Sequence, residues 1–124
     1  FKVVNDSYGH LTGDEVIRNI CDIIRNASRE TDIAGRYGGE EFVILLPDTS
    51  SKNAVNVAQR IRKAVMNTIV KYEKHELRYT CSLGVAEKLA VYTKPQMWIE
   101  AADKALYAAK ETGRNKVSVD VAEL

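Results

Sequence analysis

Two adjacent glycines, Gly38 and Gly39, separate two short apolar runs, and this feature constrains the fold more than any other. The runs cover residues 33–37 and 42–46, each long enough for a strand. Glycine adopts the positive φ angles of a two-residue turn without steric cost, so the pattern predicts a β-hairpin. Residues 43–46 are apolar on both faces, so we expect the second strand to be covered on both sides and to end at Pro47.

Helical periodicity appears on both sides of this hairpin. Apolar side chains recur at helical spacing over residues 12–28, where Thr12 and Glu15 have the spacing of a capping box. A second helix is expected to be capped by Ser50 or Ser51, since either hydroxyl can accept a hydrogen bond from an amide of the first turn.

The last third of the chain predicts one more helix between two strands. Residues 77–86 alternate between apolar and polar, as in a strand with one buried face. Pro95 suits a first helical position and Gly113 the position just past a helix end. Val117 and Val119 indicate a last strand. Helices interleaved with strands predict an α+β fold, an α/β sandwich whose mixed, mainly antiparallel sheet carries helices packed on it.

Composition and net charge restrict the kinds of partner that we expect for this chain. A chain of 124 residues with net charge +1 fits one domain and argues against broad electrostatic capture of nucleic acid or of an anionic membrane. No run of about 18 apolar residues is present, so no membrane contact is expected. Cys21 and Cys81 sit in apolar patterns sixty residues apart, and we expect both to be buried free thiols.

Several polar groups have the chemistry of a nucleotide site. Glu40 and Glu41 follow the two glycines, and paired carboxylates suit Mg²⁺ or Mn²⁺. A solvated turn with two acids chosen for solubility explains them as well. Lys110 and Arg114 could both reach one polyphosphate, although basic residues at a helix end also complement the helix dipole.

Asn5 and Asp14 could together read the edge of a guanine, since a carboxylate accepts from the ring N–H and the exocyclic amine. Taken singly, each has a plainer explanation, Asn5 as a turn former and Asp14 as a first-turn acid. Lys2 could neutralise phosphate charge, as could any surface lysine.

Considered jointly, these residues resemble the GGDEF family of diguanylate cyclases along nearly the whole chain. Five motifs occur in order and at similar spacing. The matching stretches are residues 1–10 and 13–16, then 36–42, then 82–86, and finally 102–110 with 113–115.

The resemblance implies a palm-like, ferredoxin-like fold of the nucleotidyl-cyclase type. It also implies an enzyme that condenses two GTP molecules to cyclic di-GMP with release of two pyrophosphates. Two domains would meet head to tail as a homodimer, so that each 3′-hydroxyl attacks the α-phosphorus of the facing nucleotide.

Carried over by position, the resemblance assigns roles to each group. It implies guanine contacts for Asn5 and Asp14 and Mg²⁺ or Mn²⁺ ligation for Glu40 and Glu41, one of which could be the base for the 3′-hydroxyl. Triphosphate contacts would come from Lys110 and Arg114, charge stabilisation near the transferred phosphorus from Lys2, and close backbone approach to the phosphates from Gly38 and Gly39.

A regulatory site is also implied. Arg29 and Asp32 form an Arg-x-x-Asp sequence, with five residues between Asp32 and the first hairpin glycine, where the family has its product-inhibition site. They would bind a guanine and a phosphate of cyclic di-GMP, with Arg60 as a further contact. A helix-terminal arginine followed by a turn acid is the plainer explanation.

The expected domain covers residues 1–124 and lacks the family's first strand, which normally supplies a metal-binding Asp, so this piece alone is expected to have weak or no activity. An upstream sensor domain and a cytoplasmic location are expected for the whole protein. The alternative is a non-catalytic receptor domain that binds cyclic di-GMP or GTP; retention of both hairpin acids and both guanine-reading residues favours the enzyme.

Overall fold

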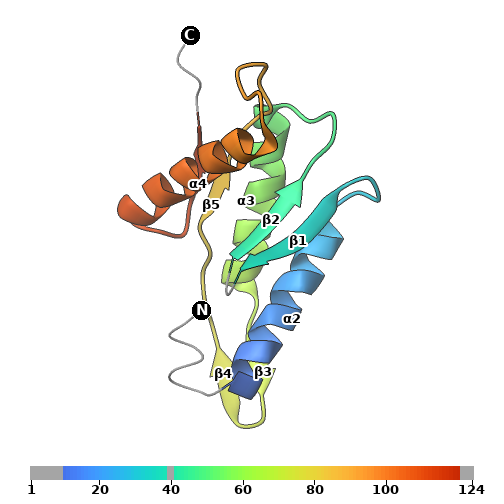
Figure 1. Ribbon diagram of the computed structural model, residues 1–124. Coiled ribbons are helices and arrows are strands. Elements are labelled where there is room, and N and C mark those ends of the chain that lie inside the picture. The colour runs from blue at the N-terminus through green and yellow to red at the C-terminus, as the bar shows by residue number, and fades with distance from the viewer. Residues whose placement is uncertain (1–9, 39–40, 121–124) are drawn as a thin grey trace. The chain divides into compact units, whose positions relative to one another are not determined.

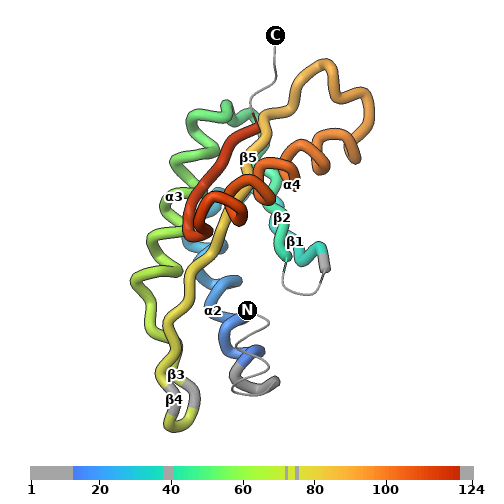
Figure 2. Tube along the Cα trace, turned by 90° about the vertical axis from the view of Figure 1, so that its left-hand side faces the viewer, coloured from blue at the N-terminus to red at the C-terminus, as the bar shows by residue number. Residues whose placement is uncertain are grey.

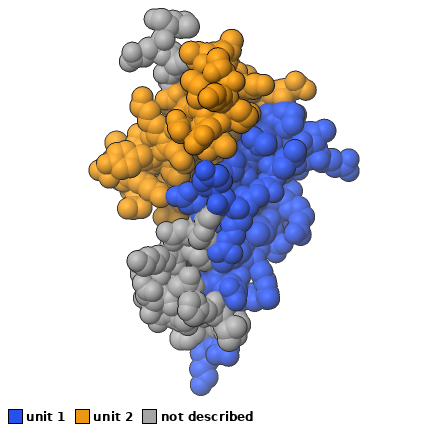
Figure 3. Space-filling model, in the orientation of Figure 1, with its two compact units in different colours: residues 1–47, 64–79 blue, residues 48–63, 80–124 orange. Residues whose placement is uncertain are grey.

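The computed structural model describes residues 10–38 and 41–120, which fall into two compact units (Figure 3). Unit 1 comprises residues 1–47 and 64–79, and unit 2 comprises residues 48–63 and 80–124. The described helices and strands confirm the α+β class. Among the described residues, no helix has both the length and the apolar character that a membrane span requires.

Unit 1 contains one long helix and two antiparallel strand pairs, whose bounds are α2 (His10–Ala27), β1 (Ile33–Gly38), β2 (Glu41–Leu45), β3 (Val70–Tyr72) and β4 (His75–Leu77). Its core forms where α2 meets the β3–β4 hairpin: Val16, Val70 and Leu77 are buried together, with Ile20 and Tyr79 packed against them. The Tyr79 hydroxyl donates a hydrogen bond to Asn19 Oδ1 at 2.7 Å, so the polar end of this side chain is satisfied.

The β1–β2 hairpin confirms the prediction from the two glycines, with two differences. Gly38 belongs to β1 and pairs with Glu41, and the register shifts between Arg36 and Gly38. The second strand is not covered on both sides, since Ile44 is only half-buried and Leu45 is 37% exposed. Within the described residues, β2 pairs only with β1.

Unit 2 contains a parallel strand pair, β5 (Leu83–Val85) with β6 (Val117–Val119), and the helix α4 (Pro95–Glu111). It also contains most of α3 (Ser51–Asn67), whose last residues belong to unit 1. Parallel strands need a crossover connection, and α4 supplies it (Figures 1 and 2). Ala101, Ala105 and Ala109 form the buried side of α4. A Cβ on Gly84 would lie 2.2 Å from the Ala102 carbonyl oxygen, so only glycine allows β5 to approach α4 this closely.

The N-terminus of α3 resolves the choice between two serines. Ser50 Oγ accepts a hydrogen bond from the Asn53 amide at 3.3 Å, which makes Ser50 the N-cap. Glu87 Oε1 accepts from the Ser51 amide at 2.6 Å, so a carboxylate from the segment after β5 also stabilises this positive helix end.

Three further expectations from the sequence are wrong. Residues 77–86 form no single strand, because β4 ends at Leu77 to pair with β3 whereas β5 starts at Leu83 to pair with β6. The first helix begins at His10, so Thr12 lies inside it and is not its cap. Both cysteines are free as expected, but Cys21 is exposed on α2.

Candidate functional site

The end of α4 is a tight chain reversal. The C-cap Thr112 donates its amide to the Ala108 carbonyl at 3.0 Å, and Gly113 follows with φ 122°. The Arg114 amide then reaches back to the Ala109 carbonyl at 2.9 Å. This pattern is a Schellman motif, in which a glycine in the left-handed region satisfies the last helical carbonyls.

This reversal brings Lys110 and Arg114 to one end of α4. Lys110 is half-buried in the last helical turn, and Arg114 is exposed. Arg114 itself has φ 63°, in a region that non-glycine residues seldom adopt. Both cations complement the negative helix end, and both stand where a polyanionic ligand could meet them.

The predicted metal site is described only in part. Glu41 opens β2, is exposed and pairs with Gly38 across the hairpin. Gly39 and Glu40 lie outside the described residues. Over residues 10–38 and 41–120, no three metal-ligating side chains gather. The Glu41 carboxylate is nevertheless of the right kind, since Mg²⁺ and Mn²⁺ prefer oxygen ligands.

Of the predicted guanine contacts, the structure places Asp14. It lies on α2 with an exposed side chain, next to the buried Gly13. Asn5 lies outside the described residues, as does Lys2. Asp14 and Glu41 belong to unit 1, whereas Lys110 and Arg114 belong to unit 2.

Arg29 and Asp32 form a closed turn between α2 and β1. The Arg29 amide donates to Asp32 Oδ2 at 2.8 Å, its guanidinium donates to Asp32 Oδ1 at 3.2 Å, and the Asp32 amide donates to the Arg29 carbonyl at 3.0 Å. The guanidinium also donates to the Pro47 carbonyl at 3.0 Å, which ties the turn to the residues after β2.

Electrostatics favour the ionised form of this turn. The hydrogen bond from the Arg29 amide lowers the pKa of the Asp32 carboxyl; desolvation opposes the shift, and the guanidinium adds to it. Asp32 is therefore a carboxylate at neutral pH and holds the arginine that precedes it. The structure thus pairs Arg29 with Asp32, while Arg60 is exposed on α3 in unit 2.

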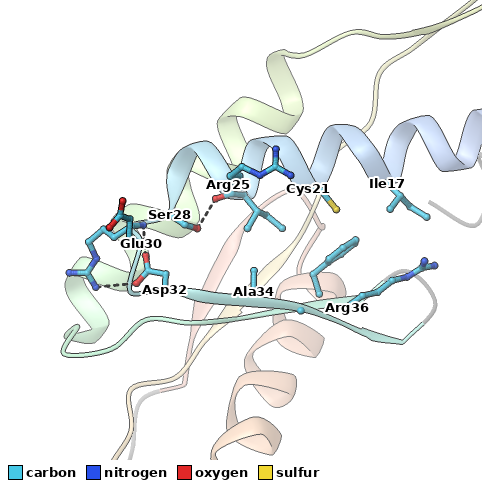
Figure 4. A pocket seen from close by; sticks show the side chains of 12 residues that line it. Ile17, Cys21, Arg25, Ser28, Glu30, Asp32, Ala34 and Arg36 are labelled. Carbon is cyan, nitrogen blue, oxygen red and sulfur yellow. Dashed lines mark hydrogen bonds and ion pairs between the residues drawn. The ribbon is translucent and has the colours of Figure 1, made fainter.

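A groove of about 490 Å³ begins at this turn and runs between α2 and β1 (Figure 4). Ala34 and Arg36 of β1 face α2 across it (Figure 4). Apolar side chains and arginines share the lining, which comprises Ile17, Cys21, Ile24, Arg25, Ser28, Arg29, Glu30, Asp32, Ala34, Gly35, Arg36 and Phe42.

Sequence reasoning assigned no role to Cys21, Arg25 or Arg36, although all three line this groove. The signal was present in the helix: residues 17, 21, 25 and 28 recur at helical spacing on one face of α2. Nothing local indicated that β1 would present Arg36 to the same space.

Comparison with known proteins gives a consistent picture. The profile of the family described as "Diguanylate cyclase, GGDEF domain" matches residues 1–116. Diguanylate cyclase A of Treponema denticola is 42% identical over 119 residues, which are 96% of this chain and 32% of that protein. The chain spans about a third of the length of the first curated relatives that it matches.

Solved structures show the same similarity. The GGDEF domain of DgcB from Caulobacter crescentus in complex with c-di-GMP is 35% identical with a TM-score of 0.91, and the match covers 98% of this chain and 70% of that one. The active GGEEF domain of a diguanylate cyclase from Vibrio cholerae is 28% identical with a TM-score of 0.87, covering 98% and 77%.

Proposed function

Because the chain belongs to the GGDEF family of diguanylate cyclases, we propose that it condenses two GTP molecules into cyclic di-GMP and two pyrophosphates. The observation that carries this proposal is the reversal at the end of α4, which presents Lys110 and Arg114 together. Phosphoryl chemistry needs mostly positioning and charge neutralisation, and two cations held at one helix end supply both.

The proposed phosphate contacts would bind phosphate in chemically different ways. Arg114 would bind phosphate oxygens as a planar fork and Lys110 as a point charge. Lys2 would stabilise the charge that develops at the transferred phosphorus. Gly38 and Gly39 would let the hairpin backbone come close to the phosphates, because neither carries a Cβ.

Base recognition would fall to Asn5 and Asp14. The Asp14 carboxylate would accept from the guanine ring N–H and its exocyclic amine, a pattern that adenine does not present. Support comes from the position of Asp14 on α2, where its exposed side chain is open to a ligand.

Glu40 and Glu41 would hold a divalent cation, Mg²⁺ or Mn²⁺. Their oxygen donors fit such an ion, and Glu41 is exposed at the start of β2. When bound, the ion would neutralise phosphate charge beside the two carboxylates. One of the two acids would accept the proton of the 3′-hydroxyl.

Each domain would hold one nucleotide, so two copies must meet head to tail for a 3′-hydroxyl to attack the facing α-phosphorus. The enzyme would therefore act as a homodimer. Use of GTP is consistent with a cytoplasmic domain regulated by an upstream sensor. The extent of the domain, residues 1–124, stays a prediction.

Incubation of the full-length protein with GTP and Mg²⁺, with pyrophosphate as the readout, tests the activity, since weak or no turnover is expected of residues 1–124 alone. Arg114→Ala and Lys110→Ala should each raise KM for GTP at least tenfold, because each removes a triphosphate contact. Lys104→Ala, an exposed charge on the same helix, is the matched control and should leave KM unchanged. GTP binding without pyrophosphate release would instead support a receptor domain.

Cyclic di-GMP would also bind at the Arg29–Asp32 turn and inhibit its own synthesis. The mostly exposed Arg29 guanidinium, paired with Asp32, lines a groove together with Arg25, Arg36, Glu30 and apolar side chains, so cations and apolar surface occur together there. Such a surface suits a ligand with phosphates and planar bases. Arg60 would be a further contact.

Calorimetric titration with cyclic di-GMP tests this second site. Arg29→Ala should weaken binding at least tenfold, while Arg18→Ala, which removes an exposed arginine of α2, should bind as wild type does. Equal affinity of the wild-type protein and Arg29→Ala would refute the inhibitory site and leave the cyclase proposal standing.

A further inference from the structure

The turn that carries Arg114 has an energetically unfavourable backbone conformation. Gly113, Arg114 and Asn115 have φ angles of 122°, 63° and 47°, so three consecutive residues occupy the left-handed side of the Ramachandran map. Only the first is a glycine. The other two each cost free energy there, and such a conformation persists only where surrounding contacts determine it.

Those contacts converge on Asn115. Its backbone amide donates to Ser82 Oγ at 3.2 Å, just before β5. Its side-chain Oδ1 accepts from Arg62 Nη1 at 3.3 Å, and Arg62 lies on α3. Both partners belong to unit 2, as does Asn115 itself. The residue after Arg114 is thus tied to two separate elements.

Arg62 is itself held in place. Its Nε donates to Gln59 Oε1 at 2.7 Å, one turn earlier on α3, while its Nη1 donates to Asn115. The rigid guanidinium fork spans these two acceptors, which a lysine with one terminal nitrogen cannot do in the same geometry. Both acceptors are neutral amide oxygens, and the contact is half-buried. Arg62 therefore acts on this turn through geometry.

We propose that Arg62 is a positioning residue for the triphosphate of the substrate. Through Asn115 it fixes the left-handed turn and so holds the Arg114 guanidinium where phosphate oxygens arrive. The inference rests on the proposed function, since it takes Arg114 as a triphosphate contact. A misplacement of about 1 Å at such a contact can cost on the order of a hundredfold.

The test compares binding of two ligands by calorimetry in the presence of Mg²⁺. One is guanosine 5′-(β,γ-imido)triphosphate, which resists hydrolysis, and the other is GMP, which lacks the β- and γ-phosphates. Arg62→Ala should weaken binding of the triphosphate about tenfold and leave GMP binding within twofold. Lys63→Ala, the next and exposed residue of α3, is the charge-matched control and should change neither affinity.

A double-mutant cycle separates positioning from general damage. In an Arg114→Ala background, Arg62→Ala should cause no further loss of triphosphate affinity, because the group it places is gone. Arg62→Lys should behave like Arg62→Ala, because the fork is lost while the charge stays. If Arg62→Ala does not fold, Asn115→Gly tolerates the positive φ and removes only the side-chain acceptor, and the same loss is expected.

Two failures are distinguishable. If Arg114→Ala weakens triphosphate binding and Arg62→Ala does not, the positioning role is wrong and the cyclase proposal stands. If the wild-type protein shows no preference for the triphosphate over GMP, the role of Arg114 in the proposed function is itself overturned.

Discussion

The carboxylate of Asp32 is held at both oxygens by Arg29, through its backbone amide at 2.8 Å and its guanidinium at 3.2 Å. The two side chains differ sharply in exposure, with 2% for Asp32 and 59% for Arg29. The acid is therefore an internal anchor, and the arginine is the group that a ligand would meet first. This division differs from the sequence-based expectation that both side chains bind the ligand.

The pairing of Asp32 with Arg29 should make the free energy of unfolding depend on pH, and the sign of that dependence follows from the direction of the pKa shift. The folded-state pKa of Asp32 is lowered, so its contribution to the free energy of unfolding is complete above the unfolded pKa of about 4 and is lost as pH falls through the folded value. Asp32→Asn should cost about 1 kcal/mol at neutral pH, and the difference from wild type should shrink in acid. Urea unfolding at several pH values measures both. Asp22→Asn, which removes an exposed ion pair with Arg25 on α2, should cost less at neutral pH.

Gly84→Ala should disrupt unit 2. The added Cβ would lie 2.2 Å from the Ala102 carbonyl oxygen and 2.4 Å from the Leu106 amide nitrogen, both backbone atoms of α4 that cannot move aside singly. We expect a loss of about 3 kcal/mol or more. GTP binding should also weaken if Lys110 and Arg114, at the end of α4, bind phosphate as proposed. Thermal unfolding provides the measurement. Gly35→Ala has open space around its Cβ and should change stability little.

The two thiols should differ in reactivity. Burial raises the pKa of the Cys81 thiol to about 11, with the Arg62 charge opposing the shift, whereas Cys21 is exposed in the α2 groove. Only the thiolate reacts, so at pH 8 iodoacetamide should modify Cys21 at least tenfold faster than Cys81. Peptide mass spectrometry resolves the two sites. Unfolding in urea should equalise the rates; a persistent difference would contradict burial as the cause.

The stability of the first turn of α3 should depend on Glu87. Its carboxylate accepts from the Ser51 amide at 2.6 Å, so Glu87→Ala leaves a helix-end donor without this partner. We expect a loss of about 1 kcal/mol, similar to that of Ser50→Ala at the N-cap. Chemical denaturation checks both. Glu100→Ala, an exposed acid on α4, should have a smaller effect.

Features governed by local sterics were predictable from the sequence. Pro95 begins α4, and Gly113 lies just past its end. Both positions follow from the φ angles that a single residue can adopt, which are restricted in proline and free in glycine. The break between Leu77 and Leu83 was not predictable. Alternation indicates which face a side chain occupies, but the pairing partners of these two strands are set by the whole chain.

The features of the candidate site also differ in whether the local sequence predicts them. The Arg29–Asp32 turn spans four residues and could be predicted from its motif. The contact between Arg62 and Asn115 joins residues 53 positions apart and has no local signature. Cys21 was misassigned because an apolar helical pattern does not distinguish the residues of α2 that line a groove from those that enter the core, such as Val16.

The parallel pairing of β5 with β6 has a consequence for the order of events during synthesis on the ribosome. Val117 pairs with Leu83 only after all of α4 has been made and has crossed back. The β1–β2 hairpin, by contrast, can close as soon as its own residues have emerged. Unit 1 also needs residues 64–79, which come after the first segment of unit 2. Residues 48–63 are therefore synthesised well before residues 80–124, with which they form unit 2, so that unit is completed only when the last part of the chain has emerged.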